Sequence, residues 1–423
     1  MKDTNPGNVY EKLGVRPIIN AYAPMTRLGG GVMPLEVADA MREATQFCVD
    51  IAELQMAASK IIAQITHAEA GCVTAGAAAS LLVGTAACVA GMDPAKMSRL
   101  PDVRGMKNEV IAMRSQRNSY DHAIRSTGVT MVEVGFCDRF TDVGVRDTEA
   151  WEIKAAITER TAAIYYLAKP QAQLRLADVV AVAHEAGVPV LVDAAAELPP
   201  VENLQRFIAE GADLVAFSGG KSIGGPQGSG ILCGRRDLIS AALLQQLDFD
   251  YDYEDWDPPA GLVDKRNIPG VPRHGIGRSC KVGKEQIVGL LTALKLFVME
   301  GNIGRHDRLL VVAQQLTEEL ADLSGLSTRI ILDPLQSGMP VVEVTLDQKS
   351  VQLTAIELVR RLRRGSPGIE VNPWRPEEGL LILSPACLAE GDPPVIGRRF
   401  KEILADHTTI AHVSAGKSKP ARE

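Results

Sequence analysis

The stretch "VAFSGGKSIGGPQGSGIL", residues 215–232, surrounds a single lysine, Lys221, with six glycines and one proline. The apolar residues within 213–219 predict a short buried strand, so Lys221 stands just beyond a strand end. In open α/β sheets, ligands bind outside the carboxyl ends of the strands. Glycines carry no side chain, and we expect those around Lys221 to let the backbone approach a flat ligand closely. The stretch therefore predicts a ligand site around Lys221.

The sequence on either side of this stretch alternates helix-like segments with short apolar runs, which is typical of a parallel sheet wrapped in helices. Strands are predicted at residues 109–114, 129–135, 162–168, 188–195 and 213–219, with an antiparallel strand at 228–234. Residues 176–187 have the apolar spacing of an amphipathic helix. We therefore expect an α/β fold with a mainly parallel sheet.

Four segments are predicted along the chain. Residues 1–45, rich in glycine and proline, form an N-terminal arm; residues 46–285 form the large domain, and residues 286–410 form a small α+β C-terminal domain. A long helix at 284–302 joins the two domains. Residues 411–423 are expected to be a flexible tail.

Composition excludes several classes of protein. The 423 residues carry a formal net charge of -7, so the chain has no excess of positive charge that would attract nucleic acid or an anionic membrane. The seven cysteines include no Cys-x-x-Cys pair, which argues against a disulfide framework and against a metal site. The amino terminus is polar and no apolar run approaches membrane-spanning length, so we expect a cytoplasmic protein.

Three strand ends carry chemically informative residues. Asp193 ends the strand in "VPVLVD", Lys221 follows "LVAFS", and the "TAGAAAS" segment from Thr74 enters a helix. Each has an ordinary explanation alone, as a turn residue, a solvated lysine or a packed helix start. Together they meet the needs of pyridoxal 5'-phosphate, which requires an amine, a carboxylate and a phosphate cradle.

Each group has a predicted role toward this cofactor. Lys221 would form the Schiff base, and Asp193 would keep the pyridine nitrogen protonated so that the ring withdraws electrons. The backbone amides of Ala75, Gly76 and Ala77 would hold the phosphate dianion at a helix N-terminus.

Two further residues complete the predicted cofactor site. Ser218, three residues before the lysine, is a candidate phosphate donor. His122 in "NSYDHAI" lies between two predicted strands, where its ring would either stack on the cofactor or serve the structure alone. A nucleotide-binding loop is excluded, because the Walker pattern requires glycine where the chain has Val215.

The segments "TAGAAASL", "VDAAAELPP" and "FSGGKSIGGPQGSGILCGRRDLI" resemble the fold-type I pyridoxal-phosphate enzymes of the selenocysteine synthase-like group. Within that group, "YEKLGVRPIINA" and "GIGRSCKVGKEQIVGLLTALK" are most similar to the D-glucosaminate-6-phosphate ammonia-lyase-like branch. The resemblance implies an aspartate-aminotransferase-like large domain and a homodimer or higher homo-oligomer with active sites at subunit interfaces. It also implies Lys221 as the cofactor lysine and Asp193 as the pyridine partner.

The same resemblance suggests roles for three basic residues, Arg278, Lys281 and Lys284. They would bind substrate anions or a neighbouring subunit's cofactor phosphate, or else form a solvated basic helix start. The chain departs from its relatives at "SPACL", from Ser384, where they tend to read Asp-Pro-Arg, so an expected anion-binding arginine is absent. It also carries Gly220 before the lysine, where selenocysteine synthases commonly have aspartate.

The predicted activity is a lyase reaction on a small-molecule amino acid, with a D- or β-hydroxy amino acid as a candidate substrate. Lys221 would remove the Cα proton, and β-elimination would give a 2-oxo acid and ammonia. The same groups would also serve an amino-acid racemase, an aldolase or a β-replacement transferase. A noncatalytic ligand-binding relative is the alternative from another class.

Overall fold

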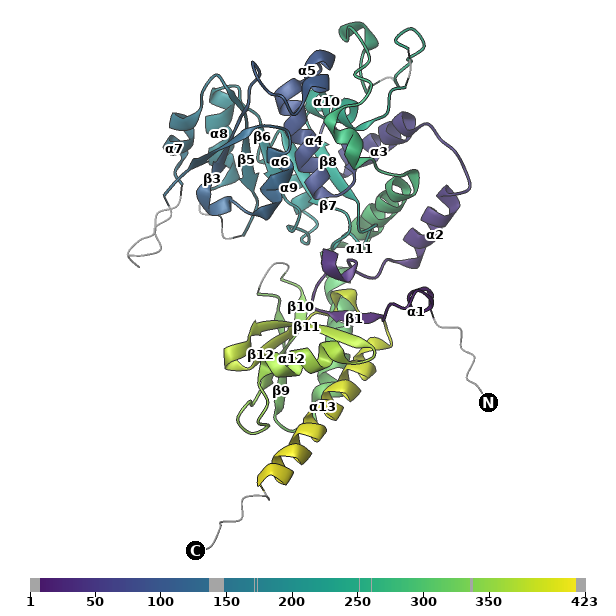
Figure 1. The fold of residues 1–423 in the computed structure, drawn as a ribbon, viewed down its shortest axis with the longest axis vertical. Helices are drawn as coiled ribbons and strands as arrows, with labels where there is room; N and C mark the ends of the chain where they lie inside the picture. Colours follow the sequence, from purple (N-terminus) through teal and green to yellow (C-terminus); the bar gives the residue numbers. More distant parts are fainter. Residues whose placement is uncertain are drawn as a thin grey trace, which may run out of the picture. The chain divides into compact units, whose positions relative to one another are not determined.

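The computed structural model describes residues 8–136, 148–170, 172, 174–250, 252–259, 261–334 and 338–415. The chain forms two compact units, one of residues 33–299 and one of residues 1–32 with 300–423 (Figure 1). Cys137 lies outside the described residues, and the six described cysteines are free thiols. The first unit carries the predicted cofactor site.

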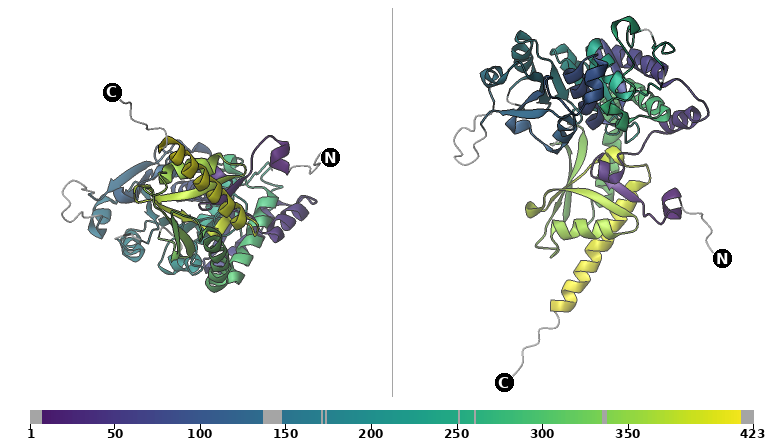
Figure 2. Two further views of the ribbon diagram at one scale, coloured as in Figure 1. Left: turned by 90° about the horizontal axis from the view of Figure 1, so that it is seen from below. Right: turned by 45° about the horizontal axis from the view of Figure 1, so that its top comes forward.

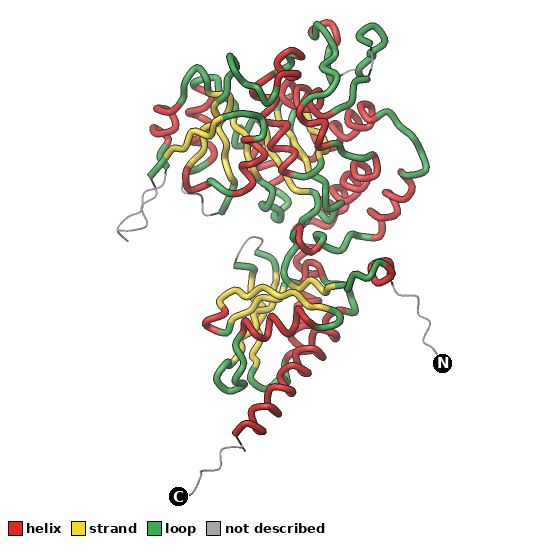
Figure 3. The backbone as a smooth tube through the Cα atoms, in the orientation of Figure 1, coloured by secondary structure: helices red, strands yellow, loops and turns green. Residues whose placement is uncertain are grey.

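The large unit is built on a seven-stranded sheet in the order β2-β8-β7-β6-β5-β3-β4. Its strands are β2 (Ala70–Thr74), β3 (Glu109–Met113), β4 (Thr130–Val134), β5 (Thr161–Leu167), β6 (Val190–Asp193), β7 (Leu214–Ser218) and β8 (Gly230–Gly234). Among these, β8 alone runs antiparallel to its neighbours. The mainly parallel α/β fold is confirmed, and helices alternate with strands along the chain (Figure 3).

Both faces of this sheet are covered by helices (Figure 1), and its strands other than the edge strand β4 are almost entirely buried. Buried residues of α3 (Ile51–Thr66), α8 (Leu176–Glu185), α9 (Asn203–Ala209) and α11 (Lys284–Leu320) pack on one face. Buried residues of α4 (Ala77–Ala90), α5 (Pro94–Arg99), α6 (His122–Arg125) and α10 (Arg236–Gln246) pack on the other. The remaining helices of the unit are α2 (Leu35–Ala44) and α7 (Ala150–Ala156).

Helix α4 packs close to the sheet because it consists largely of small residues. A Cβ atom added at Gly84 would lie 3.3 to 3.6 Å from side-chain atoms of Leu191, Leu214 and Leu232 on three adjacent strands. The glycine thus lets the helix approach the centre of the sheet, and a bulkier residue would hold it away.

The second unit is an α+β structure with a five-stranded sheet in the order β1-β11-β12-β10-β9. Its elements are α1 (Val9–Lys12), β1 (Ile18–Ala21), β9 (Leu326–Leu332), β10 (Pro340–Leu346), α12 (Ala355–Arg364), β11 (Gly368–Arg375), β12 (Leu380–Leu383) and α13 (Asp392–Ala415). Helices α12 and α13 share one hydrophobic core with this sheet (Figure 2).

Three predicted boundaries differ from the observed bounds of helices and strands. The predicted arm contains β1, which pairs in parallel with β11 because its Ile19 and Ala21 contribute to that unit's core. The predicted boundary after residue 285 falls inside α11, whose regular geometry is interrupted at Gly301 with φ of 64°. The helix α13 continues to Ala415, past the predicted start of the tail.

From the sequence, no apolar run of membrane-spanning length was expected. In the structure, helix α11 is long and apolar enough to cross a membrane, by length and composition only. Its residues Ile287, Leu290 and Leu294 are fully buried against the large sheet. This part of α11 therefore belongs to the core of the large unit, whereas Ala313, Leu316 and Leu320, after the interruption at Gly301, belong to the core of the second unit.

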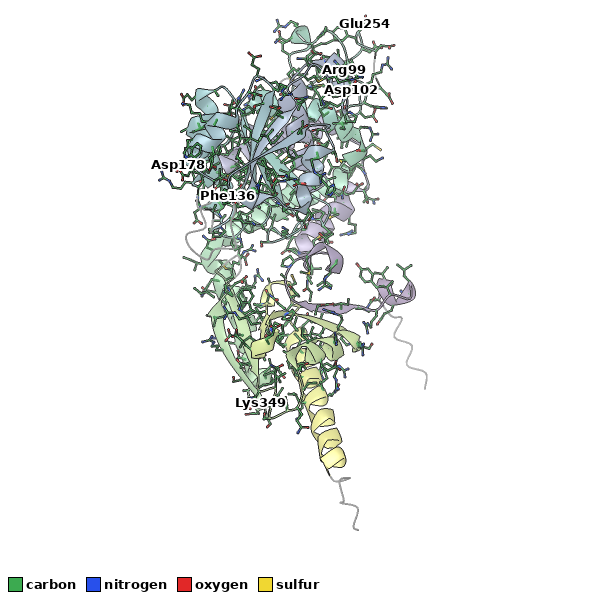
Figure 4. All side chains as sticks on the ribbon, turned by 60° about the vertical axis from the view of Figure 1, so that its left-hand side comes forward. Arg99, Asp102, Phe136, Asp178, Glu254 and Lys349 are labelled. Carbon is green, nitrogen blue, oxygen red and sulfur yellow. The ribbon has the colours of Figure 1, made fainter. Side chains whose placement is uncertain are left out.

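Charged side chains lie mainly at the periphery, as the labelled residues Arg99, Asp102, Asp178, Glu254 and Lys349 illustrate (Figure 4). Arg99 and Asp102 approach within 4.0 Å, with their side chains 47% and 38% exposed. Exposed pairs of this kind contribute about 0–1 kcal/mol each. The ion pair of Arg99 and Asp102 therefore contributes little to stability.

Candidate active site

The predicted site residues emerge at one edge of the large sheet. Because β8 is the single antiparallel strand, the carboxyl ends of β2, β3, β5, β6 and β7 all lie at the edge where β8 begins. Thr74, Asp193 and Ser218 are the last residues of β2, β6 and β7. The topology therefore brings together three strand ends that are far apart in the sequence.

The turn from Thr74 to Ala77 leaves a helix N-terminus free to accept an anion. Gly76 precedes α4 with φ of 104°, no side chain caps the helix, and its first turn contains no acidic residue. The Thr74 hydroxyl donates to the Gly76 carbonyl at 3.0 Å and lies 2.7 Å from the Ser80 hydroxyl, which fixes the turn. The uncapped amides suit a phosphate group.

Gly230, the first residue of β8, links this turn to Ser218. It pairs with Thr74 on one side and with Ser218 on the other. A Cβ atom at Gly230 would lie 2.5 Å from the Gly76 carbonyl carbon and 2.7 Å from the Ala77 nitrogen. The absent side chain thus lets the turn sit against β8, one strand away from Ser218.

Asp193 is a buried carboxylate with incomplete charge compensation. It is 5% exposed, and it accepts hydrogen bonds from the Ala195 amide at 3.0 Å and the Tyr165 hydroxyl at 3.2 Å. Burial raises the pKa of Asp193, while these hydrogen bonds and the charges of Lys221 and Lys169 oppose the rise. A protonated pyridine nitrogen would supply the missing positive partner.

Lys221 lies in the turn after β7, and its carbonyl accepts a hydrogen bond from the Gly224 amide at 2.9 Å. Burial lowers the pKa of the Lys221 ammonium group, and the negative charges of Asp193 and Glu197 partly offset this effect. Burial thus enriches the neutral amine, which is the nucleophilic form. Lys221 and Asp193 lie just after or at the ends of the adjacent strands β7 and β6, and the negative charge of Asp193 acts on the Lys221 ammonium group.

The glycines before Lys221 do not serve the purpose expected from the sequence. A Cβ atom at Gly219 would lie 2.4 Å from the Ser229 hydroxyl, and one at Gly220 would lie 2.6 Å from the Gln227 backbone. These glycines let the loop fold against its own later residues. The space that a side chain would need at Gly219 or Gly220 is occupied by other atoms of the protein. The expectation of clearance for a cofactor is wrong for these two positions.

His122 is exposed at the first position of α6. The segment before it is held by Asp121, whose buried carboxylate accepts from Arg117 at 2.6 Å and from Arg125 at 3.0 Å. The segment follows β3 and so begins at the site edge. Stacking of the His122 ring on the cofactor stays a prediction.

The three basic residues suggested by the resemblance are not joined to Lys221 or Asp193 by a contact within the described part of the chain. Arg278 donates to Asp248 at 2.8 and 2.5 Å, and Lys284 pairs with Glu285. Arg278 and the exposed Lys281 line a cavity of about 890 Å³. Acidic residues dominate its charge, namely Asp50, Glu53, Asp248, Asp255 and Asp257.

Two residues of the site were missed by the sequence analysis. Tyr165 on β5 donates to Asp193, and a tyrosine inside a buried strand is the signal that could have identified it. Glu197 follows β6 within the quoted "VDAAAELPP", and burial raises the pKa of its carboxyl group. Its charge acts on both Lys221 and Asp193.

The residues present fit pyridoxal 5'-phosphate. The donor set contains a half-buried amine of lowered pKa, a buried carboxylate that lacks a full counter-charge, and an uncapped helix N-terminus. These are the three groups that the cofactor requires.

Comparisons with known proteins agree with this fit. Residues 25–249 match the family model described as SelA: L-seryl-tRNA selenium transferase. A 5'-C-glycyluridine monooxygenase-decarboxylase of a Streptomyces species is 33% identical, over 94% of this chain and 92% of the relative. A D-glucosaminate-6-phosphate ammonia lyase of Salmonella typhimurium (strain 14028s / SGSC 2262) is 30% identical, over 95% of this chain and 98% of the relative.

A solved structure of a D-glucosaminate-6-phosphate ammonia-lyase is also similar. It matches with a TM-score of 0.79 and 29% sequence identity, covering 95% of this chain and all of that one. The fold is thus that of the fold-type I pyridoxal-phosphate enzymes, and the cofactor is pyridoxal 5'-phosphate.

The loop packing generates a prediction for Gly220→Ala. The added methyl group would collide with the Gln227 backbone, so we expect the free energy of unfolding to fall by about 1–3 kcal/mol. Urea denaturation measures the change. Gly270→Ala is the control, because a Cβ atom there meets nothing within 4 Å. Equal stability of the two variants would contradict the packing account.

The lowered pKa of Lys221 generates a second prediction. Cofactor uptake by the apoprotein requires the neutral amine, so its rate should rise with pH to a midpoint below the usual lysine pKa of about 10.5. Glu197→Gln removes a charge that raises this pKa, so its midpoint should be lower still. Stopped-flow absorbance measures both rates, and a midpoint at the ordinary lysine value would refute the assignment.

Proposed function

Because the chain belongs to the L-seryl-tRNA selenium transferase (SelA) family, we propose that Lys221 and Asp193 form the catalytic centre of an enzyme that releases ammonia from an amino acid. The chain is a pyridoxal-phosphate-dependent lyase. The observation that supports the residue assignment is that half-buried Lys221 and buried Asp193 follow the ends of the adjacent strands β7 and β6, at one sheet edge.

The proposed cofactor-holding residues follow from the geometry of the strand ends. The amides of Ala75, Gly76 and Ala77, with the Ser218 hydroxyl, would hold the phosphate, and Asp193 would hold the pyridine nitrogen. When bound, the cofactor supplies an electron sink that stabilises negative charge at the substrate Cα. Asp193 strengthens this effect by keeping a positive charge at the ring nitrogen.

Lys221 has two proposed roles in proton transfer. Its neutral amine takes the Cα proton at Nζ, and burial favours that neutral form. The resulting ammonium then gives a proton to the departing β-oxygen, which leaves as water. Addition of water to the dehydrated product releases ammonia and leaves a 2-oxo acid, so the atoms balance.

The proposed substrate is a small amino acid with a β-hydroxyl group, of D or L configuration. The ammonia-lyase relative supports the release of ammonia. A phosphorylated substrate is not favoured, because an anion-binding arginine is absent. The chain reads Ser-Pro-Ala from Ser384 to Ala386, where its relatives tend to read Asp-Pro-Arg. In the structure the Ala386 amide donates to the Ser384 hydroxyl at 3.4 Å, within a short apolar turn.

A homodimer or larger homo-oligomer in the cytoplasm is also proposed. Many large apolar residues near the amino terminus are exposed in the single chain, and a second copy would cover them. They are Val9, Tyr10, Leu13, Val15, Ile18, Val32, Leu35, Phe47 and Val49. The free thiols of the described cysteines agree with a reducing compartment.

A substrate screen tests this function. We expect the holoenzyme to convert a D- or L-β-hydroxy amino acid to equal amounts of 2-oxo acid and ammonia. Lys221→Ala should lose at least about a thousandfold in kcat, because base and acid are removed together. Lys96→Ala should retain activity, because Lys96 is a surface residue 3.8 Å from Asp93.

The other outcomes of the screen identify the alternatives. Solvent deuterium at Cα without oxo acid would indicate a racemase, and release of an aldehyde would indicate an aldolase. Oxygen uptake with carbon dioxide release would match the chemistry named for the glycyluridine relative. Any of these three results would contradict the proposed elimination.

A further inference from the structure

Tyr165 is fully buried on β5, on the same face of the sheet as Asp193. Its side chain is 0% exposed, and its hydroxyl lies 3.2 Å from Asp193 Oδ2. Asn118 Nδ2 lies 3.4 Å from the same hydroxyl oxygen. An amide NH₂ group only donates, so the tyrosine oxygen accepts from Asn118 and its own proton points to Asp193.

The orientation of Asn118 is fixed independently of Tyr165. Its Oδ1 accepts from the Tyr120 amide at 2.8 Å, and its Nδ2 also donates to the Gln116 carbonyl at 3.2 Å. Gln116 in turn accepts from the Leu167 amide at 2.7 Å, at the end of β5. The hydrogen bonds therefore run in one direction, from Asn118 through Tyr165 to Asp193.

We propose that Tyr165, oriented by Asn118, is a positioning residue that keeps Asp193 ionised and aligned for the pyridine nitrogen. One carboxylate oxygen is held by the Ala195 amide and the other by Tyr165, so the carboxylate plane is fixed from both sides. Each oxygen retains capacity for a second hydrogen bond. This inference rests on the proposed role of Asp193.

Two physical effects support this role. Burial favours the neutral carboxyl form of Asp193, and hydrogen-bond donors to the carboxylate counteract it. Burial and the nearby Asp193 charge raise the pKa of Tyr165, so the hydroxyl remains a donor over the working pH range. The other charged groups acting on this pair are Lys169, Glu197, Lys221 and Asp121.

The test compares Tyr165→Phe with Tyr166→Phe in the holoenzyme. Tyr166 is the adjacent buried residue, and its hydroxyl donates to the Leu174 carbonyl at 3.0 Å, away from Asp193. Both variants lose one buried hydroxyl from the same strand. A purely structural role would therefore predict similar behaviour.

We expect Tyr165→Phe to weaken cofactor binding about ten- to a hundredfold, the loss typical of one hydrogen bond to a buried charge. Asp193 should hold its proton to higher pH, so the acid transition of the cofactor's visible absorption should move upward. kcat should fall more than KM changes. Asn118→Ala keeps the Tyr165 hydroxyl but removes the donor that orients its proton. The acid transition of the cofactor's absorption should therefore move in the same direction, but by less.

Equal cofactor affinity and equal acid transitions in Tyr165→Phe and Tyr166→Phe would overturn the inference. Asp193→Asn separates this failure from failure of the proposed function. If Asp193→Asn binds cofactor and reacts like the unmodified protein, the assignment of Asp193 itself is wrong. If Asp193→Asn loses binding while Tyr165→Phe does not, only the role of Tyr165 is wrong.

Discussion

The carboxylate of Asp193, buried at the end of a central strand, is the constraint on which the site depends. A charge placed at 5% exposure is costly unless donors and a positive partner surround it. The protein supplies the donors through Ala195 and Tyr165, and it supplies part of the positive charge through Lys221. In the proposed assignment, a protonated pyridine ring would meet the remaining demand for positive charge.

The uncapped N-terminus of α4 lies at the same sheet edge, because β8 is inserted antiparallel between β2 and β7. Its first residue, Gly230, lacks the side chain that would collide with the turn at Gly76. The order of the strands therefore brings a carboxylate, an amine and an uncapped helix N-terminus to one edge of the sheet. The reaction that follows depends on how a substrate is oriented against them.

The strands of the large sheet, Lys221, Asp193 and the turn from Thr74 were accessible from sequence because apolar runs with polar ends carry a local signal. Tyr165 was not, because its partner Asp193 comes from another strand and only the register brings them together. The glycines before Lys221 were assigned to the cofactor, since sequence alone does not show that Gln227 folds back against Gly220. Strand β1 was missed because its partner, β11, lies at residues 368–375.

The central claim is that Lys221 is the lysine that holds the cofactor. The most direct test is borohydride reduction of the holoenzyme, followed by proteolysis and mass spectrometry of the modified peptide. The account predicts one reduced cofactor adduct per chain, on the peptide that contains Lys221. An adduct on any other lysine, with Lys221 unmodified, would contradict it.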